Sequence, residues 1–157
     1  MYGSITCVRR LAFDSGHRVF NHEGKCANLH GHSYKVFIHA SAEKLDSLGR
    51  VVDFSVLKEK FGGWIDENWD HGFLWYKDDP ICTAIFEGSQ SYSGFNSAML
   101  LKNFRCSFNP TAEEMAKFLL EKIAPKIMKN TGVRVTRVDV HETENCFAVA
   151  TVSEGKS

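Results

Sequence analysis

The 157-residue sequence lacks long apolar runs and an excess of either charge. Its 19 Lys and Arg residues balance 19 Asp and Glu residues. A neutral chain offers no basic surface for nucleic acid or an anionic membrane. No stretch approaches the roughly 18 apolar residues that a membrane-crossing helix needs, and residues 1–4 lack a basic region followed by an apolar one. We therefore expect a cytoplasmic protein that binds neither nucleic acid nor membranes.

The cysteines are few and scattered. Five is an odd number, and a chain of this length can bury a core without covalent links. A disulfide framework is therefore not expected. The length and the 43% hydrophobic content are typical of one globular domain, which we expect to span residues 1–157.

Four segments show the alternation of apolar and polar residues that is typical of half-buried strands. The first two are residues 5–13 and 33–41, separated by an excursion rich in Gly, Asn and His. The other two, 133–141 and 146–152, are spaced as a hairpin.

Two helices are predicted between these strand pairs. Asp53 is a good N-cap for a helix over residues 54–69, and Thr111 with Glu114 forms a capping box for a second helix that Pro125 should end or kink. The order ββααββ predicts an α+β fold, an antiparallel sheet with helices packed on one face.

The long connection 72–108 gives weaker signals. Residues 79–86 have helical spacing, and the Gly- and Ser-rich piece 88–97 reads as a mobile loop.

Three histidines have the spacing of metal ligands. His30 and His32 are two apart at the start of a predicted strand, so both imidazoles project from the same face. His17 lies just past the end of the preceding predicted strand, and antiparallel pairing would bring it beside them. Three neutral imidazoles without an obvious fourth ligand are typical of a catalytic zinc site with a position open to water or substrate.

Cys26 precedes His30 by four residues and has two interpretations. Its thiolate could complete a closed structural zinc site, which would make the protein non-catalytic there. Alternatively, it could act near the metal as a base or nucleophile. The spacing does not decide between them.

Residues 26–32, which read Cys-Ala-Asn-Leu-His-Gly-His, together with Phe13 and His17, resemble the family of 6-pyruvoyl- and 6-carboxy-tetrahydropterin synthases. Further resemblances follow in the same order along nearly the whole chain, at residues 52–54, 70–71, 109–113 and 141–143.

The resemblance implies a role for each candidate residue. His17, His30 and His32 would hold zinc; Cys26, Asp70 and His71 would transfer protons; Glu142 would bind the pterin. Without the resemblance, Asp70 and His71 read as a solvated pair at a helix end. Glu142 is in register with the apolar face of its strand, where a ligand would satisfy its carboxylate, although a Glu at a frayed strand end commonly faces water.

The family resemblance also implies an activity. Three residues separate Cys26 from the His-Gly-His triplet, a gap that resembles the carboxy-forming enzymes of the bacterial queuosine (7-deazaguanine) pathway. These enzymes convert 7,8-dihydroneopterin triphosphate to 6-carboxy-5,6,7,8-tetrahydropterin, acetaldehyde and triphosphate. A pyruvoyl-forming synthase remains an alternative, because the connection 72–108 is long for the family and could line the substrate mouth. A non-catalytic, zinc-stabilised binding module, with Cys26 as a fourth zinc ligand, remains another.

The fold that the resemblance implies is the tunnelling fold (T-fold), in which small sheets join around a trimeric ring and two rings stack into a hexamer. A homo-oligomer, trimer or hexamer, is therefore expected, and an exposed sheet edge that needs a partner is consistent with it.

Overall fold

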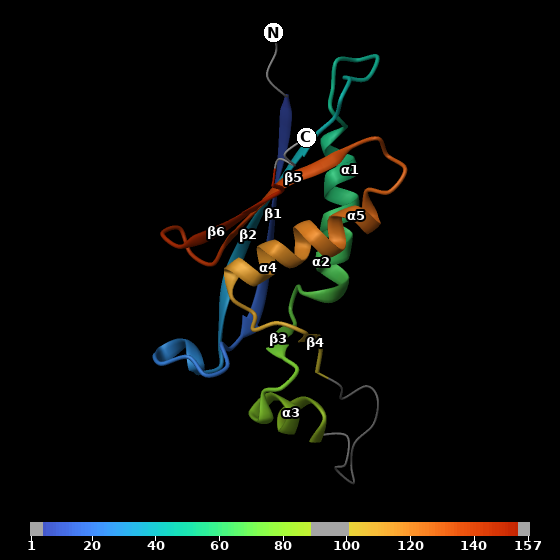
Figure 1. Cartoon of the computed structure of the whole chain (residues 1–157). Coiled ribbons are helices and arrows are strands. Elements are labelled where there is room, and N and C mark those ends of the chain that lie inside the picture. Colours follow the sequence, from blue (N-terminus) through green and yellow to red (C-terminus); the bar gives the residue numbers. More distant parts are fainter. Residues whose placement is uncertain (1–4, 89–100, 154–157) are drawn as a thin grey trace.

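The structure is a computed structural model that describes residues 5–88 and 101–153. A twisted six-stranded sheet carries two long helices on one side, and a short helix lies beyond one end of the sheet (Figure 1). The strands are β1 (Thr6–His17), β2 (His30–Ser41), β3 (Phe73–Tyr76), β4 (Asn103–Cys106), β5 (Arg134–His141) and β6 (Phe147–Thr151).

The strand order is β4-β3-β1-β2-β5-β6. The four predicted strands are present and pair antiparallel, as expected. β3 and β4 were not predicted, and they pair parallel to β1 and to each other, so the sheet is mixed rather than wholly antiparallel. Each has only four residues, too few for alternation to show in the sequence.

β1 and β2 are longer than predicted. They pair residue for residue from Thr6 opposite Ser41 to His17 opposite His30. His17 is therefore the last residue of β1 rather than a residue beyond it. The segment between the strands is therefore shorter than predicted, and it contains the short 3₁₀ turn η1 (Lys25–Ala27).

The first predicted helix is continuous across α1 (Phe54–Leu57), the π-helical turn η2 (Lys58–Gly62) and α2 (Gly63–Asn68). The Asp53 carboxylate accepts a hydrogen bond from the Ser55 N–H at 2.8 Å, as an N-cap should. The second helix comprises α4 (Ala112–Phe118), the π-helical turn η5 (Leu119–Ile123) and α5 (Ala124–Ile127), and Thr111 caps it. Pro125 does not end this helix, because the wider turn just before it accommodates the missing N–H.

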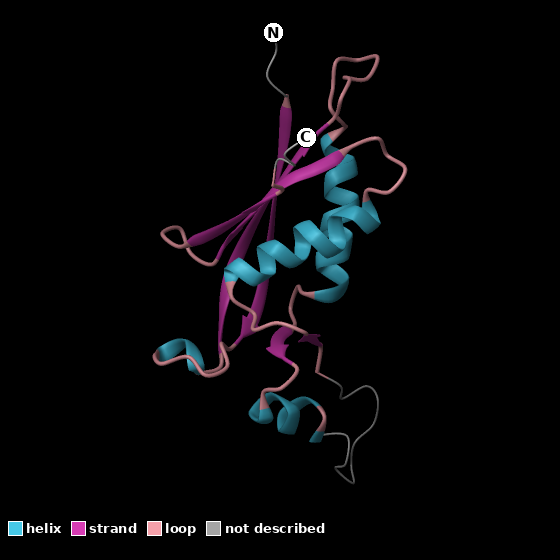
Figure 2. Cartoon of the chain, viewed as in Figure 1, coloured by secondary structure: helices cyan, strands magenta, loops and turns pink. Residues whose placement is uncertain are grey.

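One face of the sheet packs against both helices (Figure 2). On this face β1 buries Leu11 and Phe13, and β2 buries Tyr34 and Val36. The same faces of the two strands then continue into His17, His30 and His32. The apolar core therefore borders the histidines directly.

The predicted helix at residues 79–86 is confirmed as α3 (Pro80–Phe86). A small second core of Trp75, Cys82 and Phe86 holds it against β3. The loop predicted at 88–97 lies, except for Gly88, outside the described residues. Among the described residues, none of the helices is both long and apolar enough to cross a bilayer.

Candidate active site

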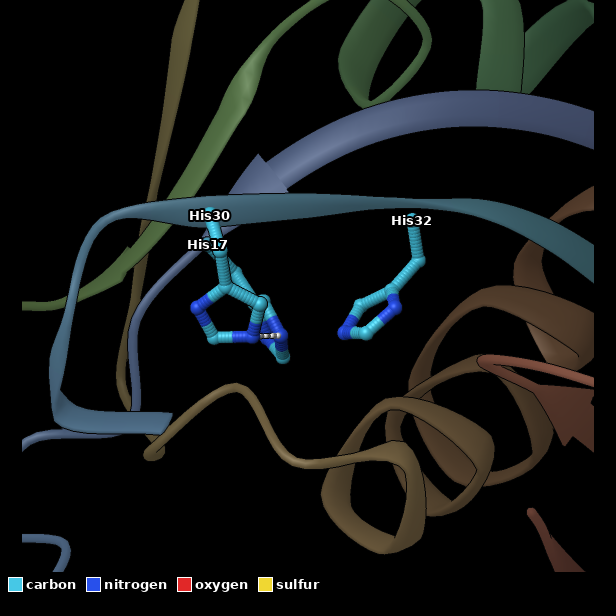
Figure 3. A group of neighbouring side chains, drawn as sticks. All are labelled: His17, His30 and His32. Carbon is cyan, nitrogen blue, oxygen red and sulfur yellow. Dashed lines mark hydrogen bonds between the residues drawn. The ribbon is translucent and has the colours of Figure 1, made fainter. Parts of the chain in front are cut away.

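His17, His30 and His32 converge at one end of the β1–β2 pair. One ligand nitrogen from each ring lies within 4.8 Å of the others. Figure 3 shows the three rings pointing into the same space, with the contact between His17 and His30 dashed. The register of the strands produces this convergence, because His17 lies directly opposite His30 and His32 follows on the same face. We call these residues the histidine group.

Backbone carbonyls fix the orientation of two of the rings. The Nδ1–H of His17 donates to the Pro110 carbonyl and that of His30 to the Asn28 carbonyl, each at 2.7 Å. The Nε2 lone pairs therefore face each other, 3.0 Å apart. Nitrogens so close need a shared proton or cation between them. Carbonyl acceptors behind metal-binding imidazoles are typical of zinc sites.

His32 supplies the third nitrogen. Its Nε2 atom is buried and has no hydrogen-bond partner among the described residues. An unpartnered buried nitrogen costs about 1–3 kcal/mol unless something binds it. The donor set of three imidazoles therefore fits a zinc ion with an open coordination position.

Burial keeps two rings of the histidine group, those of His17 and His32, uncharged. It lowers the pKa of His17 to about 4. Burial also lowers the pKa of His32, with a smaller opposing effect from Glu142. Both rings are thus neutral near pH 7, which is the form that binds metal.

Glu142 lies beside the histidine group, one residue after β5. Its two carboxylate oxygens are 4.0 Å from His17 Nε2 and 3.8 Å from His32 Nε2. The residue thus continues the buried face of Val138 and Val140, as the sequence register indicated. A partly exposed carboxylate beside a candidate metal site can accept hydrogen bonds from a ligand bound at that site.

Asp70 and His71 form a hydrogen-bonded pair despite being adjacent in sequence. His71 Nδ1 lies 2.8 Å from Asp70 Oδ2. A left-handed backbone at His71, with φ of 55°, turns the two side chains toward each other. The Asp14 backbone holds this geometry, since its N–H donates to Asp70 Oδ1 and its carbonyl accepts from the His71 N–H.

Hydrogen bonds favour the charged form of Asp70. Burial alone would raise the pKa of Asp70, but hydrogen bonds from the Asp14 N–H and from His71 hold it below its usual range. The His71 imidazole is largely exposed. It borders the same shallow hollow, of about 420 Å³, as His32.

Cys26 lies in η1, apart from the histidine group. Its carbonyl accepts a hydrogen bond from the Val19 N–H at 2.9 Å. Within the described residues, the compact metal-binding group contains only the three histidines. The structure therefore brings together His17, His30, His32 and Glu142, pairs Asp70 with His71, and leaves Cys26 on the neighbouring loop.

Sequence reasoning missed the hydrogen-bond acceptors that orient the candidate ligands. The carbonyls of Asn28 and Pro110 orient two imidazoles, but a backbone carbonyl has no sequence signature. Residues 109–111 were considered only as a helix start. A buried ion pair was also missed: Arg18, next to His17, lies 2.9 Å from the fully buried Asp79, which caps α3.

The comparison with known proteins identifies the family. A sequence model described as 6-pyruvoyl tetrahydropterin synthase matches residues 6–153. The chain belongs to this family. A protein from Rickettsia bellii named 6-carboxy-5,6,7,8-tetrahydropterin synthase is 41% identical over 91% of this chain and 97% of its own. A protein of the same name from Aquifex aeolicus is 30% identical over 86% and 90% of the two chains.

Solved structures confirm the predicted α+β tunnelling fold. An uncharacterised protein from Wolinella succinogenes superposes with a TM-score of 0.82 at 26% identity, covering 97% of this chain and all of its own. The 6-pyruvoyl tetrahydropterin synthase of Caenorhabditis elegans superposes with a TM-score of 0.66 at 21% identity, covering 98% of this chain and all of its own.

Proposed function

We propose that the protein is a zinc-dependent 6-carboxy-5,6,7,8-tetrahydropterin synthase, a carbon–carbon lyase of the queuosine (7-deazaguanine) pathway. One water and one 7,8-dihydroneopterin triphosphate would give 6-carboxy-5,6,7,8-tetrahydropterin, acetaldehyde and triphosphate. The observation that carries the proposal is the convergence of three imidazoles beside Glu142, in a family member whose relatives carry that name.

His17, His30 and His32 would hold the zinc. When bound, the ion would act as a Lewis acid on the oxygens of the substrate side chain and so acidify the neighbouring C–H bonds. The protein must then supply bases for the protons that leave. Two candidates lie on different segments: the thiol of Cys26, on the loop next to the histidine group, and the Asp70–His71 pair.

Cys26 would remove a proton on one side of the substrate side chain. His71 would act as the acid or base on the other side. The Asp70 carboxylate, 2.8 Å from His71 Nδ1, would orient that ring and stabilise its protonated form. The ring nitrogen that is not paired with Asp70 is left to exchange protons with the substrate.

Glu142 would bind the pterin ring. A pterin presents a ring N–H beside an exocyclic amine, and a carboxylate can accept both hydrogen bonds. The position of Glu142 beside His17 and His32 would place the pterin side chain at the histidine group.

Two features favour the carboxy-forming activity over the pyruvoyl-forming one. The relatives that match most of this chain are named for the first activity. The gap of three residues between Cys26 and His30 agrees with the same choice. A pyruvoyl-forming synthase, which would eliminate triphosphate without releasing acetaldehyde, is the second candidate.

The active form would be a cytoplasmic homo-oligomer, either a trimer or a hexamer. β4 and β6 are edge strands with unpaired backbone groups in the described sheet. β6 also exposes Phe147 and Val149. Pairing with a second copy would cover both the edge and these side chains.

Product analysis tests the proposal. Zinc-loaded protein is incubated with 7,8-dihydroneopterin triphosphate, and the products are identified by mass spectrometry, with metal-stripped and zinc-restored protein as controls. We expect 6-carboxy-5,6,7,8-tetrahydropterin from the loaded and restored samples only. Substrate that stays intact with fully loaded protein would favour the non-catalytic binding module.

A further inference from the structure

The Asn109 carboxamide forms two hydrogen bonds with the backbone of Phe20, a residue of the loop that carries Cys26. Its side-chain Oδ1 accepts a hydrogen bond from the Phe20 N–H at 2.8 Å. Its side-chain Nδ2 donates to the Phe20 carbonyl, also at 2.8 Å. A carboxamide both accepts and donates, so it can pair with a peptide unit in this way. Two such bonds fix the position and the direction of the backbone at Phe20.

The turn that contains Asn109 also makes a hydrogen bond to His17, the first residue of the histidine group. The carbonyl of Pro110 accepts the Nδ1–H of His17 at 2.7 Å. The Thr111 N–H donates to the Asn109 carbonyl at 2.7 Å, and Thr111 caps α4. The turn is therefore anchored to a long helix, and it contacts the chain at both His17 and Phe20.

Cys26 follows Phe20 by six residues in the same loop. The Val19 N–H donates to the Cys26 carbonyl at 2.9 Å. The backbone of Cys26 is thus attached to the residue just before the one that Asn109 holds. These contacts connect the Cys26 backbone to Phe20 and its partner Asn109, and Val19 is two residues from His17.

We propose that Asn109 is a positioning residue that sets where the Cys26 thiol lies relative to the histidine group. The inference rests on the proposed function only in giving Cys26 a role in turnover. Asn109 acts through the backbone of Phe20, and the carbonyl that orients His17 belongs to Pro110. Removing the Asn109 side chain should therefore displace Cys26 while leaving the zinc ligands in place.

Two substitutions and one control test this. Asn109→Ala removes both hydrogen bonds. Asn109→Asp keeps the acceptor but sets a second oxygen against the Phe20 carbonyl. The control is Asn103→Ala: Asn103 also makes two bonds, one from the Trp75 indole and one to the Leu101 carbonyl, but in β4, away from the Cys26 loop.

Three quantities are measured on the full-length, zinc-loaded protein. Zinc content should stay the same in all variants. For Asn109→Ala, kcat should fall by about 10–100-fold, as for outer partners of metal sites, with a smaller change in KM. The alkylation rate of Cys26 by iodoacetamide, divided by that of the exposed Cys146, should change by about threefold or more because the thiol has moved. Asn103→Ala should alter neither kcat nor this ratio.

Each outcome of these measurements supports or overturns the positioning role of Asn109. An Asn109→Ala protein with an unchanged alkylation ratio overturns the proposal, whatever its kcat, because the loop has then not moved. If that variant does not fold, Asn109→Asp is judged by the same ratio. A changed ratio with an unchanged kcat supports the positioning and rejects the role of Cys26 in turnover, so failure of the proposed function is distinguishable.

Discussion

Replacing His32 by alanine should affect zinc affinity and the stability of the zinc-free protein very differently. Structural zinc sites bind with about 10–16 kcal/mol over four ligands, or roughly 3 kcal/mol for each ligand. Losing one of three imidazoles should thus weaken zinc binding by about 100-fold or more. Without zinc, however, the His32 Nε2 atom is buried and unpartnered. Its removal relieves a cost of about 1–3 kcal/mol, which offsets the lost packing of a side chain that is 19% exposed.

The zinc-free His32→Ala protein should therefore unfold within about 1 kcal/mol of its parent, a Tm difference of roughly 2–4 °C. His39→Ala is the matched control. His39 lies on the same strand with 18% exposure, but it contacts Asp139 at 3.3 Å. This control should keep its zinc and lose stability. Zinc is measured by elemental analysis and chelator competition, and stability by thermal unfolding with and without chelator. Full zinc occupancy in His32→Ala would refute the assignment of the ligands.

Three further predictions follow from the same geometry. Cys26→Ala should keep zinc and fold but lose about 10²–10⁴-fold in kcat, whereas Glu142→Ala should chiefly raise KM; loss of zinc from Cys26→Ala would instead make the thiol a ligand. Sedimentation should find a trimer or hexamer, and a fully active monomer would contradict assembly through the sheet edges. Burial alone would raise the pKa of Asp139, but Arg137 at 2.7 Å and His39 hold it below its usual range. Its carboxylate therefore stabilises the fold above the unfolded pKa of about 3.9, and this contribution is lost as the pH falls through the lower folded pKa. Asp139→Asn should cost about 1–3 kcal/mol at pH 7 and flatten the acid limb of a stability–pH profile; an unchanged profile would contradict this.

The strands and helices that alternate over many residues could be predicted from the sequence. The pairing of β1 with β2 followed from their patterns, and it brought His17 to His30 as expected. β3 and β4 were missed because four residues give no detectable period. Of the two outcomes predicted at Pro125, an end or a kink, the end is wrong: the helix continues to Ile127 after a π-helical turn, which depends on local packing rather than on residue type.

In the candidate site, too, some features could be predicted from the sequence and others could not. The spacing of His30 and His32 predicts a shared face, and the register of Val138, Val140 and Glu142 predicts a carboxylate on the apolar side. The pairing of Asp70 with His71 depends on a left-handed backbone at a residue other than glycine, which the sequence does not reveal. The Pro110 carbonyl that orients His17 and the Asn109 contacts with Phe20 come from a segment about 90 residues away in the chain.

The measurement that tests the central claim most directly is the yield of acetaldehyde. Purified, zinc-loaded protein is given a known amount of 7,8-dihydroneopterin triphosphate, and acetaldehyde and pterin products are quantified together as the substrate disappears. The account predicts one acetaldehyde and one 6-carboxy-5,6,7,8-tetrahydropterin for each substrate consumed. Release of triphosphate with 6-pyruvoyl-tetrahydropterin and no acetaldehyde would contradict it.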